Sequence, residues 1–319
     1  MPKVLITRRW PSAVEAELQR RYELTVRDSS LSAAEWHSAL NEYDAICPCV
    51  IDKITADMLT VLNPRTKIIA NFGVGYNHID LVAAAARGIS VTNTPDVLTH
   101  ATADLAMTLM FMLARRAGEG ERQLRSHQWH GWYPTHLMGT QVTGATLGII
   151  GMGRIGMAMA QKAHDGFGMK ILYHNRKPVN ESMVYAMKAE YCSDMDNLLQ
   201  RSDFVAVHCP GGKNNRHMIN AAALAQMQPH AFLINTARGD VVDESALVTA
   251  LQQGQIAGAG LDVYENEPEV SQALLTMQNV VLLPHLGSAT TATREAMGMR
   301  VLSNLDAFFS GQQLPDRVV

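Results

Sequence analysis

Three side chains that could do acid–base chemistry each follow a short apolar run in the C-terminal half of the chain. They are Arg238, Glu267 and His285. If the apolar runs are neighbouring parallel strands, their carboxyl ends share one edge of a sheet, where open α/β sheets bind their ligands. The spacing therefore predicts that an arginine, a glutamate and a histidine converge on one site.

These three residue types suit the reduction of a 2-oxo acid to a 2-hydroxy acid. A guanidinium can hold the substrate carboxylate with its planar fork and polarise the carbonyl group. An imidazolium can protonate the carbonyl oxygen as a hydride reaches the carbon. A carboxylate bonded to an imidazole fixes the ring's orientation and favours its protonated form near neutral pH. Arg238, Glu267 and His285 are therefore the candidate catalytic residues.

A glycine-rich turn predicts where the hydride donor binds. Its residues are Gly151, Met152, Gly153, Arg154, Ile155 and Gly156. An apolar stretch at 146–150 precedes it, and a helix-like stretch from Arg154 to about His164 follows. Glycines in this strand–turn–helix setting let backbone N–H groups approach a pyrophosphate at a helix N-terminus. The turn therefore predicts a dinucleotide site.

The next strand, at 170–173, lacks the acidic residue that would follow it in an NAD site. A carboxylate there holds the ribose 2′-hydroxyl of NAD, but this chain has His174, Asn175, Arg176 and Lys177. Because Arg and Lys attract a 2′-phosphate that a carboxylate would repel, we expect NADP, with NAD as a weaker alternative. The competing interpretation of Arg176 is an ordinary surface arginine, and Asn175 could simply shape the turn.

Alternating apolar and helix-like segments predict an α/β protein with parallel sheets. In the first hundred residues the expected strands are 4–7, 45–47, 68–70 and 90–92, and the expected helices are 13–21, 57–62 and 80–86. After Gly144 the expected strands are 147–150, 170–173, 204–207, 231–234, 259–261 and 280–283. Six strands with helices between them suit a dinucleotide domain.

Two further helices are expected, at about 101–117 and at 291–309. The first is apolar on too many faces for a lone surface helix. We attribute that apolarity to burial against a partner subunit, which predicts a homodimer.

Length and composition limit the class of protein. A chain of 319 residues with 47 % apolar residues can form two domains with packed cores. The formal net charge of −3 gives no sign of a nucleic-acid or membrane partner. The four cysteines follow no disulfide or metal pattern and are expected to be reduced. The longest apolar segment, 105–114, is too short to span a bilayer, and no signal peptide is evident, so we expect a cytoplasmic protein.

Several longer motifs, in order along the chain, carry a resemblance to a known family. They are 71–80 (Asn-Phe-Gly-Val-Gly-Tyr-Asn-His-Ile-Asp), 103–106, 147–156, 235–239, 260–264, 265–268 and 284–287. With these motifs the chain resembles the D-isomer-specific 2-hydroxyacid dehydrogenases over nearly its whole length. The resemblance implies a doubly wound Rossmann-type dinucleotide domain at 99–286. It also implies a smaller flavodoxin-like α/β substrate domain formed by 1–98 and 287–319.

The resemblance also implies roles for matching positions. Arg238 matches the substrate-binding arginine, Glu267 the acid that tunes the histidine, and His285 the proton donor. Val74 and Gly75 match a loop whose backbone amides hold the substrate carboxylate. Arg154, Ile155 and Gly156 match the pyrophosphate-binding turn, and Thr236, Asp262 and Gly287 match positions near the nicotinamide. The strand end at Asn175 and Arg176 departs from the family, which has an acid there. The other candidate cofactor-binding residues are Gly151, Gly153, Asn175, Arg176, Lys177 and Ala237.

Within the family, the likeness is strongest to glyoxylate/hydroxypyruvate reductases and 2-ketogluconate reductases. In those enzymes a tryptophan matching Trp132 borders the substrate pocket, sometimes that of the partner subunit. For Trp132 itself we expect partly buried packing, with a direct substrate role as the alternative. Glutamate at position 267, where formate dehydrogenase has glutamine, disfavours that enzyme. The favoured function is NADPH-dependent reduction of glyoxylate or hydroxypyruvate to the D-2-hydroxy acid. The alternatives are a 2-ketogluconate reductase, another D-2-hydroxyacid dehydrogenase and, more remotely, a dinucleotide-sensing transcriptional co-regulator.

Overall fold

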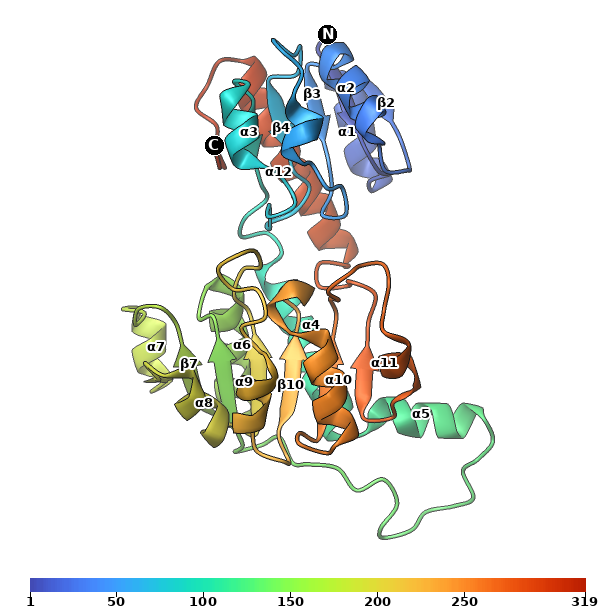
Figure 1. Ribbon diagram of the computed structural model, residues 1–319, viewed down its shortest axis with the longest axis vertical. Helices are drawn as coiled ribbons and strands as arrows, with labels where there is room; N and C mark the ends of the chain where they lie inside the picture. The colour runs from blue at the N-terminus through green and yellow to red at the C-terminus, as the bar shows by residue number, and fades with distance from the viewer. The chain divides into compact units, whose positions relative to one another are not determined.

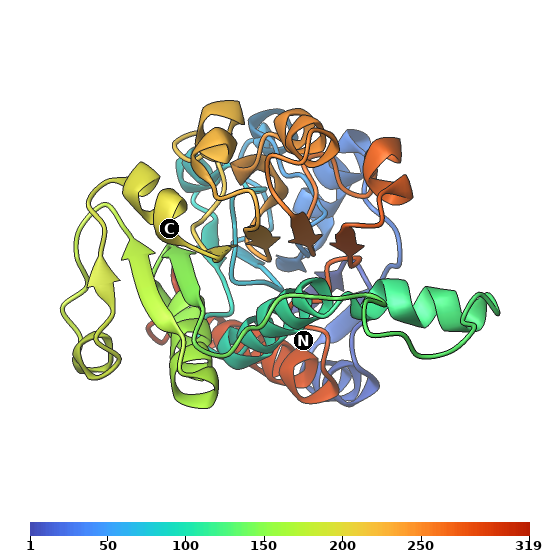
Figure 2. The same ribbon diagram turned by 90° about the horizontal axis from the view of Figure 1, so that it is seen from below.

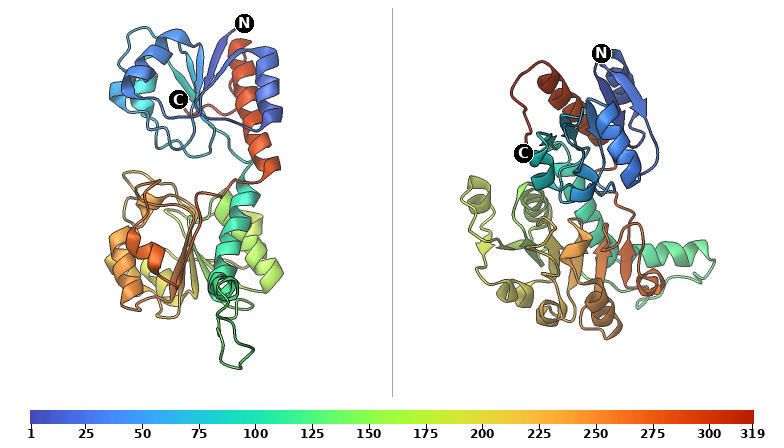
Figure 3. Two further views of the ribbon diagram at one scale, coloured as in Figure 1. Left: turned by 90° about the vertical axis from the view of Figure 1, so that its right-hand side faces the viewer. Right: turned by 45° about the horizontal axis from the view of Figure 1, so that its top comes forward.

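The computed structural model describes all residues from Met1 to Val319, and the chain divides into two compact units. One unit comprises Met1–Leu98 and Ser288–Val319, and the other comprises Thr99–Gly287. Each unit is a parallel sheet between layers of helices (Figure 3), so the expected α/β class is confirmed. No helix in either unit combines the length and the apolarity needed to cross a bilayer.

The first unit is built on a five-stranded parallel sheet with the order β2-β1-β3-β4-β5. Its elements are β1 (Lys3–Ile6), α1 (Ser12–Arg21), β2 (Glu23–Val26), α2 (Ala33–Glu42), β3 (Ala45–Cys47), the 3₁₀ helix η1 (Ala56–Leu59), β4 (Ile68–Ala70), α3 (Leu81–Ala86), β5 (Ser90–Thr92) and α12 (Thr291–Phe309). Helices α1 and α12 cover one face of this sheet, and α2, η1 and α3 cover the other (Figure 3).

Two elements of this unit, β2 and α2, were not expected from the sequence. Strand β2 lies at the sheet edge and is nowhere fully buried, so its sequence carries no strong apolar pattern. Helix α2 does begin with a readable signal, because Ser32 and Glu35 form a reciprocal capping box. The expected helix at 57–62 is instead the 3₁₀ turn η1.

The second unit is built on a seven-stranded parallel sheet with the order β12-β11-β10-β9-β6-β7-β8. Its strands are β6 (Thr146–Ile150), β7 (Lys170–His174), β8 (Glu190–Tyr191), β9 (Phe204–Val207), β10 (Phe232–Asn235), β11 (Gly258–Leu261) and β12 (Val280–Leu282). Its helices are α4 (Thr99–Ala114), α5 (Ala117–Arg125), α6 (Arg154–Phe167), α7 (Ser182–Ala186), α8 (Met195–Arg201), α9 (Ala221–Gln226), the 3₁₀ helix η2 (Gly239–Val241), α10 (Glu244–Gln252) and α11 (Gln272–Thr276). The expected number of six strands is wrong, because the two-residue edge strand β8 is too short to show a pattern.

The strands of this unit are apolar without interruption because both faces of the sheet are covered. Phe204 and Ala206 belong to the core that the sheet shares with α4 and α6. Val205 and Val207 alternate with them and belong to the core shared with α8, α9 and α10. Figures 1 and 2 show these two helix layers on opposite faces of the sheet.

Helix α4, whose apolarity suggested a partner subunit, is buried within its own unit. It packs against α6 and against strands β10 and β11. Leu109 and Met110 are fully buried, and a Cβ at Gly260 on β11 would lie only 3.0 Å from Leu109. The helix packs this closely on the sheet, so its apolarity is no argument for a homodimer. It ends at Ala114, before Arg116 adopts a left-handed backbone with φ of 50°.

Candidate active site

Arg238, Glu267 and His285 lie in the loops that follow β10, β11 and β12, which are neighbours in one parallel sheet. The carboxyl ends of these strands share one edge, so the three loops meet there. His285 Nδ1 lies 2.8 Å from Glu267 Oε2. Arg238 is close enough for its charge and that of Glu267 to stabilise each other. The structure therefore brings together the three side chains that the sequence singled out.

Glu267 is held at both carboxylate oxygens. Oε2 meets the His285 imidazole, while Oε1 accepts a hydrogen bond of 3.0 Å from the Tyr264 N–H. The Tyr264 hydroxyl in turn donates to the carbonyl of Leu283, at 2.9 Å. Burial would raise the pKa of Glu267, but the hydrogen bond and charge of His285, with the Tyr264 N–H and Arg238, leave that pKa below its ordinary value. Glu267 is therefore an ionised, oriented carboxylate.

Asp262 shapes the turn that presents His285. Its carbonyl accepts from the His285 N–H at 3.0 Å. Its carboxylate accepts from the N–H groups of Leu286 at 2.6 Å and Gly287 at 2.8 Å. Burial raises the pKa of Asp262. Both carboxylate oxygens of Asp262 accept hydrogen bonds from the backbone. Asp262, which was expected beside the nicotinamide, therefore holds the loop that carries His285.

Arg238 extends from a turn fixed by Asn235. The Asn235 side chain donates to the Arg238 carbonyl at 2.9 Å and accepts from the Ala237 N–H at 3.0 Å. A Cβ at Gly239 would lie 1.9 Å from the carbonyl carbon of Tyr264, so this turn packs directly on the backbone leading to Glu267. Burial lowers the pKa of Arg238, yet a guanidinium keeps its charge in proteins.

The glycine turn lies where the strand order reverses, between β6 and β9. Gly151 has φ of 99°, and a Cβ there would lie 2.6 Å from the Cys209 nitrogen after β9. A Cβ at Gly156 would lie 2.4 Å from the Gly151 carbonyl oxygen, so α6 packs tightly on the turn. A Cβ at Gly153 would meet nothing within 4 Å. Two glycines thus close the turn, and the third leaves its outer side open.

The start of helix α6 fits the pyrophosphate of a dinucleotide. Arg154, Ile155 and Gly156 form its first turn, and Gly153 before them provides no side-chain cap. Helix N-termini bind anions through their free N–H groups and the helix dipole. Thr236, after β10, has a buried hydroxyl oxygen that finds no hydrogen-bond partner in the protein, as expected for a group that a ligand completes.

Asn175 and its two basic neighbours have different surroundings. The Asn175 side chain accepts a 2.7 Å hydrogen bond from the Met152 N–H, so it holds the glycine turn. Arg176 and Lys177 are exposed and form no ion pair with the protein. Their charges are therefore available to an anionic ligand beyond the end of β7.

The family model described as "D-isomer specific 2-hydroxyacid dehydrogenase, NAD binding domain" matches residues 107–287. The chain belongs to this family. It is 45 % identical over 325 residues to the glyoxylate reductase of Thermococcus litoralis, covering 99 % of this chain and 96 % of that protein. It is 36 % identical to the glycerate dehydrogenase of Hyphomicrobium methylovorum, with 98 % and 97 % covered. The expected family is thereby confirmed.

A solved structure in the same family has a closely similar fold. It is the NADPH-dependent glyoxylate/hydroxypyruvate reductase of Sinorhizobium meliloti, in complex with NADP and malonate. The TM-score is 0.89 at 38 % sequence identity, with 100 % of this chain and 97 % of that chain covered. The agreement extends over both units, so the two-domain fold of the 2-hydroxyacid dehydrogenases is confirmed.

In the first unit of the present chain, three side chains that were not singled out from the sequence hold the loop that contains Val74 and Gly75. Asn71 donates to the carbonyls of Gly73 and Gly75, each at 3.0 Å, and Asn93 donates to the carbonyl of Val74 at 2.8 Å. His78 contacts Asn71 Oδ1 at 3.0 Å. The N–H groups of Val74 and Gly75 form no hydrogen bond with the protein. The loop can therefore offer both to a carboxylate.

Trp132 does not fit the expectation of partly buried packing. Its side chain is 79 % exposed, in the loop after α5. Trp129 and Tyr133 in the same loop are also more than half exposed. Helix α5 and this loop extend away from the sheet of their unit (Figures 1 and 2), so nothing within the unit buries these aromatic rings.

His208, which was not singled out from the sequence, directly follows β9 and so lies after a strand end like the other site residues. It is enclosed beside the glycine turn, where Nε2 lies 3.1 Å from the Met159 sulfur and Nδ1 finds no partner. Burial lowers its pKa from 6.5 to about 4. A strand-end position after the apolar run 204–207 was the available signal.

This burial predicts an acid-sensitive fold. Between about pH 6.5 and 4, His208 is protonated in the unfolded chain and neutral in the folded chain. The unfolded state therefore binds one more proton, and the free energy of unfolding falls as the pH drops through that range. From pH 7 to pH 5, wild type should lose about 2 kcal/mol more than His208→Leu. Urea unfolding at both pH values measures this, with His100→Gln, an exposed histidine of the same unit, as the control. Parallel losses in wild type and His208→Leu would contradict the assignment.

Proposed function

We propose that this family member reduces a small 2-oxo acid, glyoxylate or hydroxypyruvate, to the D-2-hydroxy acid with NADPH as hydride donor. The observation that carries the proposal is the 2.8 Å contact between Glu267 and His285, with Arg238 at the same sheet edge. A partly buried arginine beside an oriented histidine–carboxylate pair is suited to anchoring an anion while a proton reaches its carbonyl oxygen.

Each of the three residues has a defined part in this proposal. Arg238 binds the substrate carboxylate and polarises the carbonyl. His285 donates the proton from Nε2, since Nδ1 is bonded to Glu267. Glu267 stabilises the protonated imidazole and prevents the ring from turning. A bound nicotinamide supplies the hydride.

The unit 99–287 is proposed as the cofactor-binding domain, with a boundary near the expected 99–286. The first turn of α6 would hold the pyrophosphate, and Thr236 with Ala237 and Gly287 would border the nicotinamide. The unit formed by 1–98 and 288–319 is proposed as the substrate domain. In it, the N–H groups of Val74 and Gly75 would bind the substrate carboxylate.

We attribute the proposed preference for NADP over NAD to Arg176 and Lys177, whose side chains would contact the 2′-phosphate. The relative from Sinorhizobium meliloti is described as NADPH-dependent, which supports this reading. Arg176→Ala should weaken NADPH binding about 10- to 100-fold, because a charge-assisted contact to the 2′-phosphate is lost. NADH binding should change less than about twofold. Fluorescence titration of both dinucleotides measures this; Lys170→Ala, at the opposite end of β7, is the control. Equal effects on both cofactors would exclude the phosphate contact.

We also propose a cytoplasmic homodimer. The exposed rings of Trp129, Trp132 and Tyr133 support the dimer, since a partner subunit would bury them. Trp132 would then lie at or near a subunit interface, where it could border a partner's pocket. Sedimentation equilibrium of wild type and Trp132→Ala distinguishes a dimer from a monomer.

A substrate panel tests the proposed reaction. Initial rates are measured with glyoxylate, hydroxypyruvate, 2-ketogluconate and pyruvate, each with NADPH and with NADH. The highest kcat/KM should belong to glyoxylate or hydroxypyruvate with NADPH. A maximum with 2-ketogluconate would move the assignment to that reductase. Tight NADPH binding without turnover of any 2-oxo acid would contradict enzymatic function and favour a dinucleotide-sensing binding protein.

A further inference from the structure

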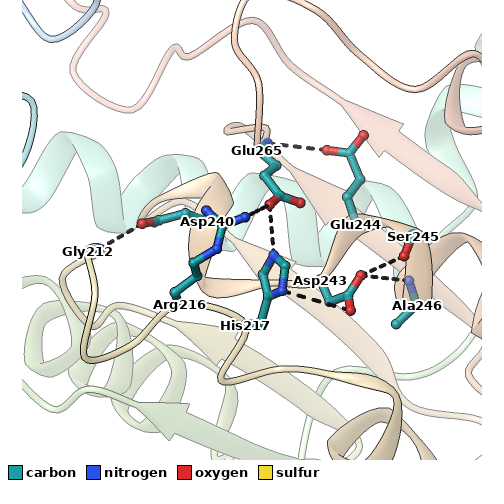
Figure 4. A network of polar contacts seen from close by, with 9 residues as sticks. All are labelled: Gly212, Arg216, His217, Asp240, Asp243, Glu244, Ser245, Ala246 and Glu265. Atoms are coloured by element: carbon teal, nitrogen blue, oxygen red, sulfur yellow. Dashed lines mark hydrogen bonds and ion pairs between the residues drawn. The ribbon is translucent and has the colours of Figure 1, made fainter. Parts of the chain in front are cut away.

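Glu265, two residues before Glu267, is the centre of a polar network that the proposed chemistry does not use (Figure 4). Its Oε1 accepts hydrogen bonds from Arg216 Nη2 at 2.6 Å and from His217 Nε2 at 2.7 Å. The Glu265 side chain is only 16 % exposed. His217 Nδ1 lies 4.0 Å from an Asp243 carboxylate oxygen on its other side. Two donors from the loop after β9 therefore meet on one oxygen beside the site.

The backbone of Glu265 is fixed as well. Its N–H donates to the Glu244 carboxylate on α10 at 3.3 Å, and the other oxygen of Glu244 accepts from the Ser271 N–H at 3.2 Å. Glu244 thus holds both ends of the loop 265–271, which contains Glu267. A Cβ at Gly239 would lie 2.4 Å from the Glu265 nitrogen, so the turn carrying Arg238 rests on the same point.

The position of Glu267 depends on these contacts, because no long helix or strand sets it. Between β11 and α11 the chain has no regular element beyond the isolated bridge between Asn266 and Glu269. A displacement of about 1 Å in a group next to the reacting atoms can cost up to about 10²-fold in rate. The loop therefore needs anchors outside the catalytic residues themselves.

We propose that Glu265 is a positioning residue that holds Glu267 against His285 through the contacts of its Oε1 with Arg216 and His217. The proposal rests on the proposed function. It assigns to Glu265 a geometric role, set by the length of its side chain and the presence of one acceptor oxygen. Its negative charge is not required.

Three substitutions separate geometry from charge. Glu265→Gln keeps the chain length and the Oε1 acceptor but loses the charge. Glu265→Asp keeps the charge but shortens the side chain by one methylene, so it cannot reach both donors. Glu265→Ala removes both. Glu190→Ala, which breaks an exposed ion pair with Arg201 at strand β8 in the same unit, is the matched control.

The expected result is a loss of kcat of about 10- to 100-fold in Glu265→Ala and Glu265→Asp, with most of the loss recovered in Glu265→Gln. The dissociation constant for NADPH should stay within about twofold of wild type, since the glycine turn is untouched. The alkaline limb of the pH profile of kcat should move to lower pH in Glu265→Asp, because a looser Glu267 stabilises the imidazolium less. Arg238 and Asp262, the other charged groups around this pair, are the same in every variant.

A spectroscopic readout needs no turnover. In protein labelled with ¹⁵N-histidine, the Nδ1 resonance of His285 reports its contact with Glu267, and it should shift in Glu265→Asp and stay near the wild-type value in Glu265→Gln. Unchanged kcat and an unchanged resonance in Glu265→Asp would overturn the proposal. A loss in Glu265→Gln as large as in Glu265→Asp would also overturn it, because charge would then be the cause. If wild type reduces no 2-oxo acid, the proposed function fails, while the resonance still tests the positioning.

Discussion

Replacing His285 by alanine should lower kcat for 2-oxo acid reduction by about 10²- to 10⁴-fold, the usual contribution of a general acid. The dissociation constant for NADPH should change little, since no hydrogen bond of the glycine turn involves His285. With Nδ1 at 2.8 Å from Glu267, the ring presents Nε2 as its proton donor. Alanine removes that donor and leaves water as the proton source. Steady-state rates with glyoxylate or hydroxypyruvate, and fluorescence titration of NADPH, measure the two quantities.

A second histidine–carboxylate pair provides a matched control for this experiment. His230 Nε2 lies 2.8 Å from Asp203 Oδ1. These residues come just before strands β10 and β9, so the pair lies at the amino ends of the strands, away from the site at their carboxyl ends. The distance between the ring nitrogen and the carboxylate oxygen is the same as in the His285 pair, but no site residue lies at the amino ends of the strands. His230→Ala should therefore keep wild-type kcat. Near-wild-type turnover in His285→Ala would show that another group supplies the proton.

The second large effect is expected at Arg238. Arg238→Ala should lower kcat/KM by about 10²- to 10³-fold, because an anionic substrate would be left without its partly buried cationic partner. Arg238→Lys should recover only part of this loss, since an ammonium lacks the planar fork that pairs with a carboxylate. The loss should be divided between a higher KM and a lower kcat, because the guanidinium both anchors the substrate and polarises its carbonyl. Arg201→Ala, which removes an exposed arginine paired with Glu190, is the control.

Removal of Arg238 should also change the pH dependence, with a sign that the electrostatics fix. The positive charge of Arg238 helps to lower the pKa of Glu267. Without it that pKa rises, so Glu267 takes up a proton at a higher pH than in wild type. The acid limb of the pH profile of kcat should therefore move to higher pH in Arg238→Ala. An unmoved acid limb with an undiminished kcat/KM would show that Arg238 and Glu267 do not act on one site.

Much of the fold was predictable because its strands are buried on both faces. Such strands read as continuous apolar runs. The predicted bounds of β3, β4, β5 and β9 match the structure to the residue, and those of β6, β7, β10 and β11 differ by one residue at one or both ends. Helix α12 was also located to the residue. Of the missed elements, the strands β2 and β8 are edge strands of their sheets, where partial exposure weakens the apolar pattern.

The apolarity of α4 shows the limit of such patterns. A sequence reveals that a helix must be buried, but it does not say which surface buries it. The strong apolarity was attributed to a partner subunit, whereas α6 and strands β10 and β11 of the same unit cover the helix. Trp132 shows the reverse case, since a large aromatic ring expected to be partly buried is 79 % exposed.

The family, the glycine turn and the three chemical groups could be recognised from the amino-acid sequence, because residue types and their positions after apolar runs are visible in it. The contacts between individual atoms became evident only from the folded structure. It placed Glu267 Oε2 against His285 Nδ1, committed the Asp262 carboxylate to the backbone of the histidine turn, and turned Asn175 toward the glycine loop. It also revealed Glu265, His208 and the asparagines around Val74. The contacts of Glu265, His208 and Asn93 join segments that lie apart in the sequence, and such contacts exist only once a sheet has brought those segments together.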